Sequence, residues 1–280
     1  MTDEKKGLMY ASEPPKVRAS ESNHWYTKDG TPQYTVVGKN GKERNTTLRD
    51  AREMGLFPSV TTIIGAAAKP ALIAWMQTEV LKASQLIVRR EGEADQDYFD
   101  RIMDESKRKG KEAADKGTAI HAAIESFFEG ISHPGYPEHV QACVRALEAH
   151  FGRIGWVAER SFAHEIGFAG KCDLHAPEIA FKGGLVADVK TKDFSDESEV
   201  KGYDDHLMQL AAYRVGLGIP FARCANIFVA REKKDDGSVP CKIIEWEEED
   251  LKRGWEMFVR LLEFWQLKNK YRGRDHENVS

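Results

Sequence analysis

Cysteine is scarce in this 280-residue chain, and the four residues that occur lie far apart. No pair shows the Cys-x-x-Cys spacing of a zinc ribbon or of a tight iron–sulfur ligand run, so neither kind of centre is expected. The spacing favours isolated buried thiols in a reducing compartment. The four are Cys143, Cys172, Cys224 and Cys241.

Long apolar runs and a marked excess of one charge are lacking as well. No window is long enough to cross a bilayer, so no membrane partner is expected. The segment Met1–Lys6 is charged and no apolar stretch follows it, which predicts no secretion signal and a soluble, cytoplasmic protein. The 41 basic and 45 acidic residues nearly cancel. Bulk charge therefore neither supports nor excludes nucleic acid as a partner.

The chain is predicted to have a short leader, a β-hairpin extension and one large α/β domain. A polar leader with the pair Pro14-Pro15 is typical of disorder. The turn dipeptides Asp29-Gly30 and Asn40-Gly41 indicate β-hairpins after it. With 41% hydrophobic residues, the remainder is long enough to bury a sizeable core. The predicted bounds are 1–22 for the leader, 23–56 for the extension and 57–280 for the domain, divided into a helical part (57–155) and a catalytic sheet with flanking helices (156–280).

Within the large domain, helical and strand patterns follow one another in a definite order. Three strand-like runs between Val157 and Lys192 are separated at Gly170, Pro177 and Gly183-Gly184. The last helix has large apolar residues spaced three and four apart, which indicates packing and not a cofactor site. The order predicts a small mixed sheet flanked by helices. The other expected elements are helices from Pro70 and over 98–128, 137–152 and 203–216, and strands over 224–231 and 240–246.

The segment around Asp188 carries the strongest chemical signal. Residues two apart on a strand share a face, so Asp188 and Lys190 are expected side by side. Charges on a buried strand are costly unless they meet a partner or a metal. Taken alone, an Asp-x-Lys pair on a strand usually marks a surface edge.

Asp173 lies on a preceding strand-like run, fifteen residues before Asp188. Antiparallel pairing of the two strands would bring their carboxylates together. A hard cation such as Mg²⁺ or Mn²⁺ relieves the repulsion between such carboxylates. The alternative is that Asp173 caps a turn of the hairpin.

Two helical signals flank these strands. Gln209 and Tyr213 are four apart and share one helix face, where they would order a phosphate or the lysine; an ordinary amphipathic helix gives the same pattern. Gly117 and His121 lie in an earlier helix. A neutral imidazole there can complete a carboxylate-rich metal site, although a lone helical histidine is commonly a packed core or surface residue.

Taken in order, these signals resemble the RecB-like exonuclease branch of the PD-(D/E)xK nuclease superfamily. Within it the chain is most similar to the mitochondrial genome maintenance exonuclease and its phage-encoded relatives. The resemblance spans residues 57–215. It rests on Gly-x-x-x-His, Gly-x-x-Asp, Asp-x-Lys and Gln-x-x-x-Tyr in that order, and on the opening segment Phe57–Ile64 followed by a helix with Trp75.

The resemblance implies a restriction-endonuclease-like core and assigns roles to individual residues. His121, Asp173, Asp188 and the backbone carbonyl of Val189 would hold Mg²⁺ or Mn²⁺. Lys190 would activate the attacking water and stabilise the phosphorane-like transition state. The residues expected around this centre are Gln209 and Tyr213 as braces of the site or substrate contacts, Ser59, Thr61 and Thr62 as contacts to the DNA backbone, and Glu159 as an additional acid.

The implied function is that of a metal-dependent exonuclease acting on free ends of DNA, preferably single-stranded, in phage-type recombination, repair or replication. Because no cysteine cluster follows the Gln-Tyr helix, no iron–sulfur cluster is expected. Recombination or replication proteins are the expected protein partners. A duplex-resecting exonuclease or a structure-specific endonuclease on the same core stays open. So does a DNA-binding accessory protein on an inactive core.

Overall fold

The structure is a computed structural model that describes residues 24–133 and 135–273. The predicted disordered leader, residues 1–22, lies outside the described residues.

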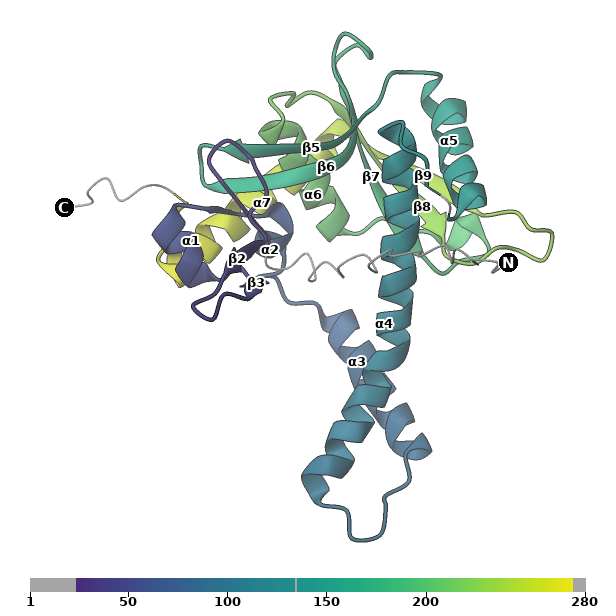
Figure 1. Ribbon diagram of the computed structural model, residues 1–280. Coiled ribbons are helices and arrows are strands. Elements are labelled where there is room, and N and C mark those ends of the chain that lie inside the picture. Colours follow the sequence, from purple (N-terminus) through teal and green to yellow (C-terminus); the bar gives the residue numbers. More distant parts are fainter. Residues whose placement is uncertain (1–23, 134, 274–280) are drawn as a thin grey trace, which may run out of the picture.

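A five-stranded mixed sheet forms the centre of the fold (Figure 1). Its strands, in spatial order, are β5 (Val157–His164), β6 (Phe168–Ala176), β7 (Leu185–Lys192), β8 (Arg223–Ala230) and β9 (Cys241–Trp246). The pair β7 and β8 is parallel, and the other neighbours are antiparallel. A parallel pair requires a crossover connection, which contains η2 (Glu197–Glu199) and α6 (Asp204–Gly216). The predicted α/β class with a small mixed sheet is confirmed.

Helices cover both faces of this sheet and form two apolar cores. On one face lie α4 (Asp95–Phe128) and α5 (Pro137–Phe151). On the other face lie α6, α2 (Val60–Ile64) and α7 (Glu248–Asn269). The predicted apolar stripe of α7 packs inside the molecule, since four of its five members are buried and the fifth is partly buried against them. These are Leu251, Phe258, Leu262 and Trp265, with Trp255 beside them.

A two-helix arm projects from the body of the molecule (Figure 1). It consists of α3 (Pro70–Leu86) and the first half of α4, which pack against each other. Pro70 is the first residue of α3, as predicted, because a proline at this position loses no helical hydrogen bond. Helix α4 begins three residues before the predicted start at 98 and runs back to the sheet, so one helix joins the arm to the body.

The N-terminal extension contains a hairpin, but its first strand pairs elsewhere. β2 (Thr35–Val37) and β3 (Glu43–Asn45) form the hairpin, and the turn between them contains the predicted dipeptide Asn40-Gly41. β1 (Trp25–Tyr26) pairs mainly with β4 (Phe57–Pro58), beyond helix α1 (Leu48–Met54). The extension is therefore tied to the segment that opens the large domain. The division between them at residue 57 stays a prediction.

The separation of the first two sheet strands at Gly170 was predicted wrongly. Gly170 lies inside β6, and the turn falls at Gly167, which has a φ of 102°. Gly170 is small for a packing reason: a Cβ there would lie 3.0 Å from ring atoms of both Phe162 and Tyr213. A glycine within a strand can be needed because neighbouring side chains pack directly against its backbone. In the sequence such a glycine is easily mistaken for a turn residue.

Among the described residues, no helix has the length and apolar character needed to cross a membrane. The cysteines are free thiols; Cys143, Cys172 and Cys224 are buried, and Cys241 is partly buried. Burial raises the pKa of Cys224 and of Cys241 to about 12, so both are unreactive thiols at neutral pH.

Candidate active site

The site forms where the β6–β7 ladder ends. The last paired residues of that ladder are Leu174 and Ala187, so Asp173 and Asp188 are next along their strands where pairing stops. The Val189 amide donates a hydrogen bond to Asp173 Oδ2 at 2.8 Å across this opening. Asp173 therefore lies within a strand and caps no turn. The antiparallel arrangement predicted for the two aspartates is confirmed.

His121 reaches Asp173 because α4 lies very close to β7. A Cβ added at Gly117 would lie 2.5 Å from Thr191 Oγ1, so any larger residue would force the threonine or the helix to move. One turn later along the helix, His121 Nε2 is 2.9 Å from Asp173 Oδ2. The spacing Gly-x-x-x-His thus has a structural reason. The glycine lets helix α4 lie close to β7, and the histidine one turn later can then contact Asp173.

The imidazole and the carboxylate hold each other in charged forms. Burial opposes the charge on His121, but the negative charge of Asp173 and its hydrogen bond outweigh it and raise the pKa of His121 to about 9. Burial likewise opposes ionisation of Asp173, yet His121 lowers the pKa of this carboxyl below its usual value. In the metal-free protein the two groups form an ion pair at neutral pH.

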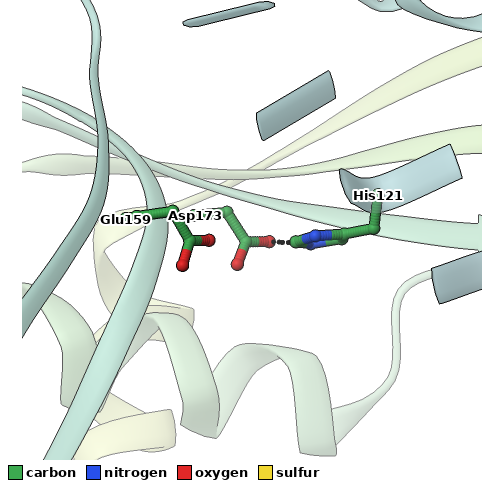
Figure 2. A group of neighbouring side chains, drawn as sticks. All are labelled: His121, Glu159 and Asp173. Carbon is green, nitrogen blue, oxygen red and sulfur yellow. Dashed lines mark hydrogen bonds and ion pairs between the residues drawn. The ribbon is translucent and has the colours of Figure 1, made fainter. Parts of the chain in front are cut away.

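Glu159 joins this pair from the neighbouring strand β5. One ligand atom from each of His121, Glu159 and Asp173 lies within 4.8 Å of the others, and Figure 2 shows the two carboxylates side by side. The backbone of Glu159 has a φ of 54°, rare for a residue with a side chain. The residues before and after Glu159 pair with Leu174 and Cys172, which leaves Glu159 out of the ladder opposite Asp173. This irregularity of β5 accompanies the convergence of the two acids.

Asp188 is the most deeply buried acid of the site, and two side chains contact its carboxylate. Its side chain is 1% exposed. Lys190 Nζ lies 2.9 Å from Asp188 Oδ2, and Asn226 Nδ2 donates to the same oxygen at 2.9 Å. Asn226 lies opposite Asp188 on β8 and accepts a hydrogen bond from Trp246 Nε1 at 2.8 Å. A buried carboxylate without such partners would be strongly destabilising.

Lys190 is held in place by the helix that follows the strand. Lys190 Nζ donates to Gln209 Oε1 at 2.9 Å, and Gln209 Nε2 donates to the hydroxyl of Tyr213 at 2.8 Å. Gln209 and Tyr213 are 6% and 5% exposed, so this chain of bonds orders the lysine from inside the protein. His206, on the same helix, stays neutral because burial and the nearby charge of Lys190 lower its pKa to about 4.

The three hydroxyl residues of the opening segment bond one another at the start of α2. Ser59 Oγ accepts from the Thr62 amide at 3.0 Å and contacts the hydroxyls of Thr61 and Thr62. Ser59 is buried and caps the helix, whereas Thr61 and Thr62 are partly buried. A contact of these residues to DNA stays a prediction, as does a metal contact by the Val189 carbonyl.

Two residues of the site were not predicted from the sequence. Asn226 lies in the middle of the apolar strand β8, where the amide is fully buried. The sequence feature that could have indicated it is a single amide side chain among the apolar residues of this strand. Lys171, two residues before Asp173, forms an ion pair with Glu159. In the sequence, Lys171 and Asp173 are two residues apart on one strand and so share a face. Only Asp173 of this pair was given a role.

Comparison with known proteins gives likeness only at the level of structure. No family model matches the sequence, and no curated protein matches it. An alkaline exonuclease, LHK-Exo, from Laribacter hongkongensis is similar with a TM-score of 0.31 and 13% identity, over 55% of this chain and 80% of that one. Its complex with dAMP gives a TM-score of 0.29 and 14% identity, over 54% and 88%. A phage related exonuclease from Haemophilus somnus 129PT gives 0.30 and 15%, over 55% and 82%. At such TM-scores the chemistry must be inferred from the side chains of this chain.

Proposed function

We propose that this chain is a divalent-metal-dependent DNA exonuclease that hydrolyses phosphodiester bonds from free ends. The observation that carries the proposal is the convergence of acids and one ordered ammonium at the open end of the β6–β7 ladder. His121, Glu159 and Asp173 meet there, and Asp188 holds Lys190 beside them. Acids grouped around a fixed cation suit phosphodiester hydrolysis, in which negative charge grows on the phosphoryl oxygens.

The donor set fits Mg²⁺ or Mn²⁺. Carboxylate oxygens suit both ions, and one imidazole nitrogen is compatible with Mn²⁺ in particular. His121, Asp173 and Asp188 would hold the ion, with Glu159 as a further acid. When bound, a divalent ion supplies Lewis-acid polarisation and lowers the pKa of water.

The remaining residues orient these groups. Lys190 places a positive charge where the phosphate gains negative charge, and Gln209 fixes the direction of that ammonium. Asn226 donates to Oδ2 of Asp188 and so limits rotation of this carboxylate. We assign Gln209 and Tyr213 a positioning role, since both are buried beneath the lysine.

The finer parts of the proposal follow from the family resemblance. They are the requirement for a free end, the preference for single strands, the absence of an iron–sulfur cluster, and a role in phage-type recombination, repair or replication in the cytoplasm. We infer that basic residues of the α3–α4 arm and of the loop that joins its two helices would meet phosphates. In the structure Arg89 pairs with Asp95, and Arg108 pairs with Glu105 and Glu112. DNA would therefore have to compete with these acids.

End-labelled linear and circular single-stranded DNA, incubated with Mg²⁺, Mn²⁺ or EDTA, would test the proposal. We expect metal-dependent loss of linear DNA alone, and the labelled products would give the direction of digestion. Cleavage of the circle would indicate an endonuclease, and a preference for linear duplex would indicate a resecting exonuclease. DNA binding without cleavage in either metal would contradict the proposal and favour an inactive core that binds DNA.

A further inference from the structure

Lys171 is a cation inside the site to which the proposed chemistry gives no role. It lies on β6 two residues before Asp173, and its ammonium forms an ion pair with Glu159 Oε2. The side chains of Lys171 and Glu159 are only 19% and 9% exposed. An ion pair so little exposed is weakly screened by solvent, so its presence strongly affects any other charge that approaches Glu159.

Each of the three acids of the site has its own basic partner, and the three partners differ in kind. Asp173 is paired with His121, which offers a ring nitrogen to a metal. Asp188 is paired with Lys190, which Gln209 holds in place. Glu159 is paired with Lys171, whose ammonium cannot coordinate a metal. The Lys171 ammonium and a divalent ion would therefore use the same carboxylate and repel each other.

We propose that Lys171 competes with the divalent ion for Glu159, and that a phosphate group in the site relieves this competition by giving the ammonium another anion to bind. Metal and substrate then bind cooperatively, and Lys171 is the residue that couples them. The inference rests on the proposed function and adds one condition, that Glu159 is itself a ligand of the proposed metal. Coupling of this kind is reciprocal: phosphate strengthens metal binding by the factor by which metal strengthens phosphate binding.

Calorimetric titration with Mn²⁺, with and without thymidine 5′-monophosphate, measures this coupling without any cleavage. For the wild type we expect the nucleotide to tighten Mn²⁺ binding several-fold. Lys171→Met should bind Mn²⁺ about tenfold more tightly than the wild type without nucleotide, and should show little further gain with it. Lys171→Arg keeps the charge and should retain most of the wild-type coupling.

Lys82→Met is a matched control, because Lys82 also pairs with a nearly buried acid, Glu79, but lies on the arm. Its Mn²⁺ affinity and coupling should equal those of the wild type, which separates local competition from a general loss of positive charge. Thermal unfolding of each variant would verify that the fold persists.

The results distinguish failure of this inference from failure of the proposed function. Equal or weaker Mn²⁺ binding by Lys171→Met, with normal binding by the wild type, would overturn the competition and leave the metal site standing. Unchanged coupling in Lys171→Met would overturn the role of Lys171 in cooperativity. If none of the four proteins binds Mn²⁺, with or without nucleotide, the proposed function falls and the inference with it.

Discussion

The open end of the β6–β7 ladder and the α3–α4 arm are both rich in charged side chains, but their charges are arranged differently. In the site, partners come from different elements: Asp173 on β6 pairs with His121 of α4, and Asp188 on β7 is held by Asn226 of β8. On the arm, partners are near in sequence. Arg108 contacts Glu105 and Glu112, one turn away on either side, and its side chain is 50% exposed.

Charged pairs of the site such as His121 with Asp173 form only when the tertiary fold brings their elements together. The charged pairs of Arg108 on the arm form within a single helix. Removing one member of a buried network leaves the other without a partner in a poorly solvated place, which is costly. Removing one member of an exposed pair within a helix returns the other to water at little cost. Substitutions should therefore have large effects in the site and small ones on the arm.

The largest effect is expected from Asp188→Asn. The amide keeps the shape of the side chain but removes the charge that faces Lys190 and that would bind the proposed metal. We expect kcat on linear single-stranded DNA with Mn²⁺ to fall by at least about 10³-fold. Asp196→Asn, at an exposed turn, is the control and should cleave normally. Retention of even a tenth of the wild-type rate by Asp188→Asn would show that this carboxylate is dispensable.

A smaller effect is expected from Gln209→Leu, which removes the acceptor that orients Lys190. Because Gln209 is buried and positions another side chain, kcat should fall by about 10- to 100-fold while KM changes little. Gln266→Leu removes a hydrogen bond from a helix side chain to the Ile166 carbonyl, outside the site, and serves as the control. A rise in KM with kcat unchanged would instead indicate direct contact between Gln209 and DNA.

The next effect concerns stability against pH and depends on His206. Its pKa is about 4 in the folded protein, against an ordinary value of 6.5. Between these values the unfolded chain binds a proton that the folded chain does not, so stability falls as pH falls from 6.5 to 4. His206→Gln should reduce this loss in the free energy of unfolding by about 1–2 kcal/mol, measured by urea unfolding across that range.

His139, which is buried, and His164 and His175, which are partly buried, have pKa values lowered in the same direction, so part of the acid sensitivity should remain in the variant. Parallel pH dependence in the wild type and His206→Gln would show that His206 is protonated at its ordinary pH in the folded protein.

The smallest effect is expected from Arg108→Ala on the arm. Both of its acidic partners lie on the same helix, Glu112 is exposed and Glu105 is partly exposed, so the urea midpoint of unfolding should equal that of the wild type within experimental error. A clear loss of stability would remove the contrast between the arm and the site.

The sequence predicted the fold class, the antiparallel pairing of the strands that carry Asp173 and Asp188, and the contact of Lys190 with Asp188, because period-two spacing and strand pairing are local rules. It did not predict the position of Glu159 opposite Asp173, since the left-handed backbone at Glu159 depends on packing that local spacing does not encode. Asn226 was missed because its partner lies on another strand. The turn was predicted at Gly170 and lies at Gly167, because the sequence does not distinguish a glycine needed for packing from one needed for a turn.

Cleavage of linear single-stranded DNA by Asp173→Ala, with Mn²⁺ and beside the wild type, tests the central claim most directly. Asp173 contacts His121 and the Val189 amide and belongs to the potential metal-binding group. We predict metal-dependent digestion by the wild type and none by the variant, with both proteins folded by circular dichroism. Digestion by folded Asp173→Ala at the wild-type rate would contradict the account.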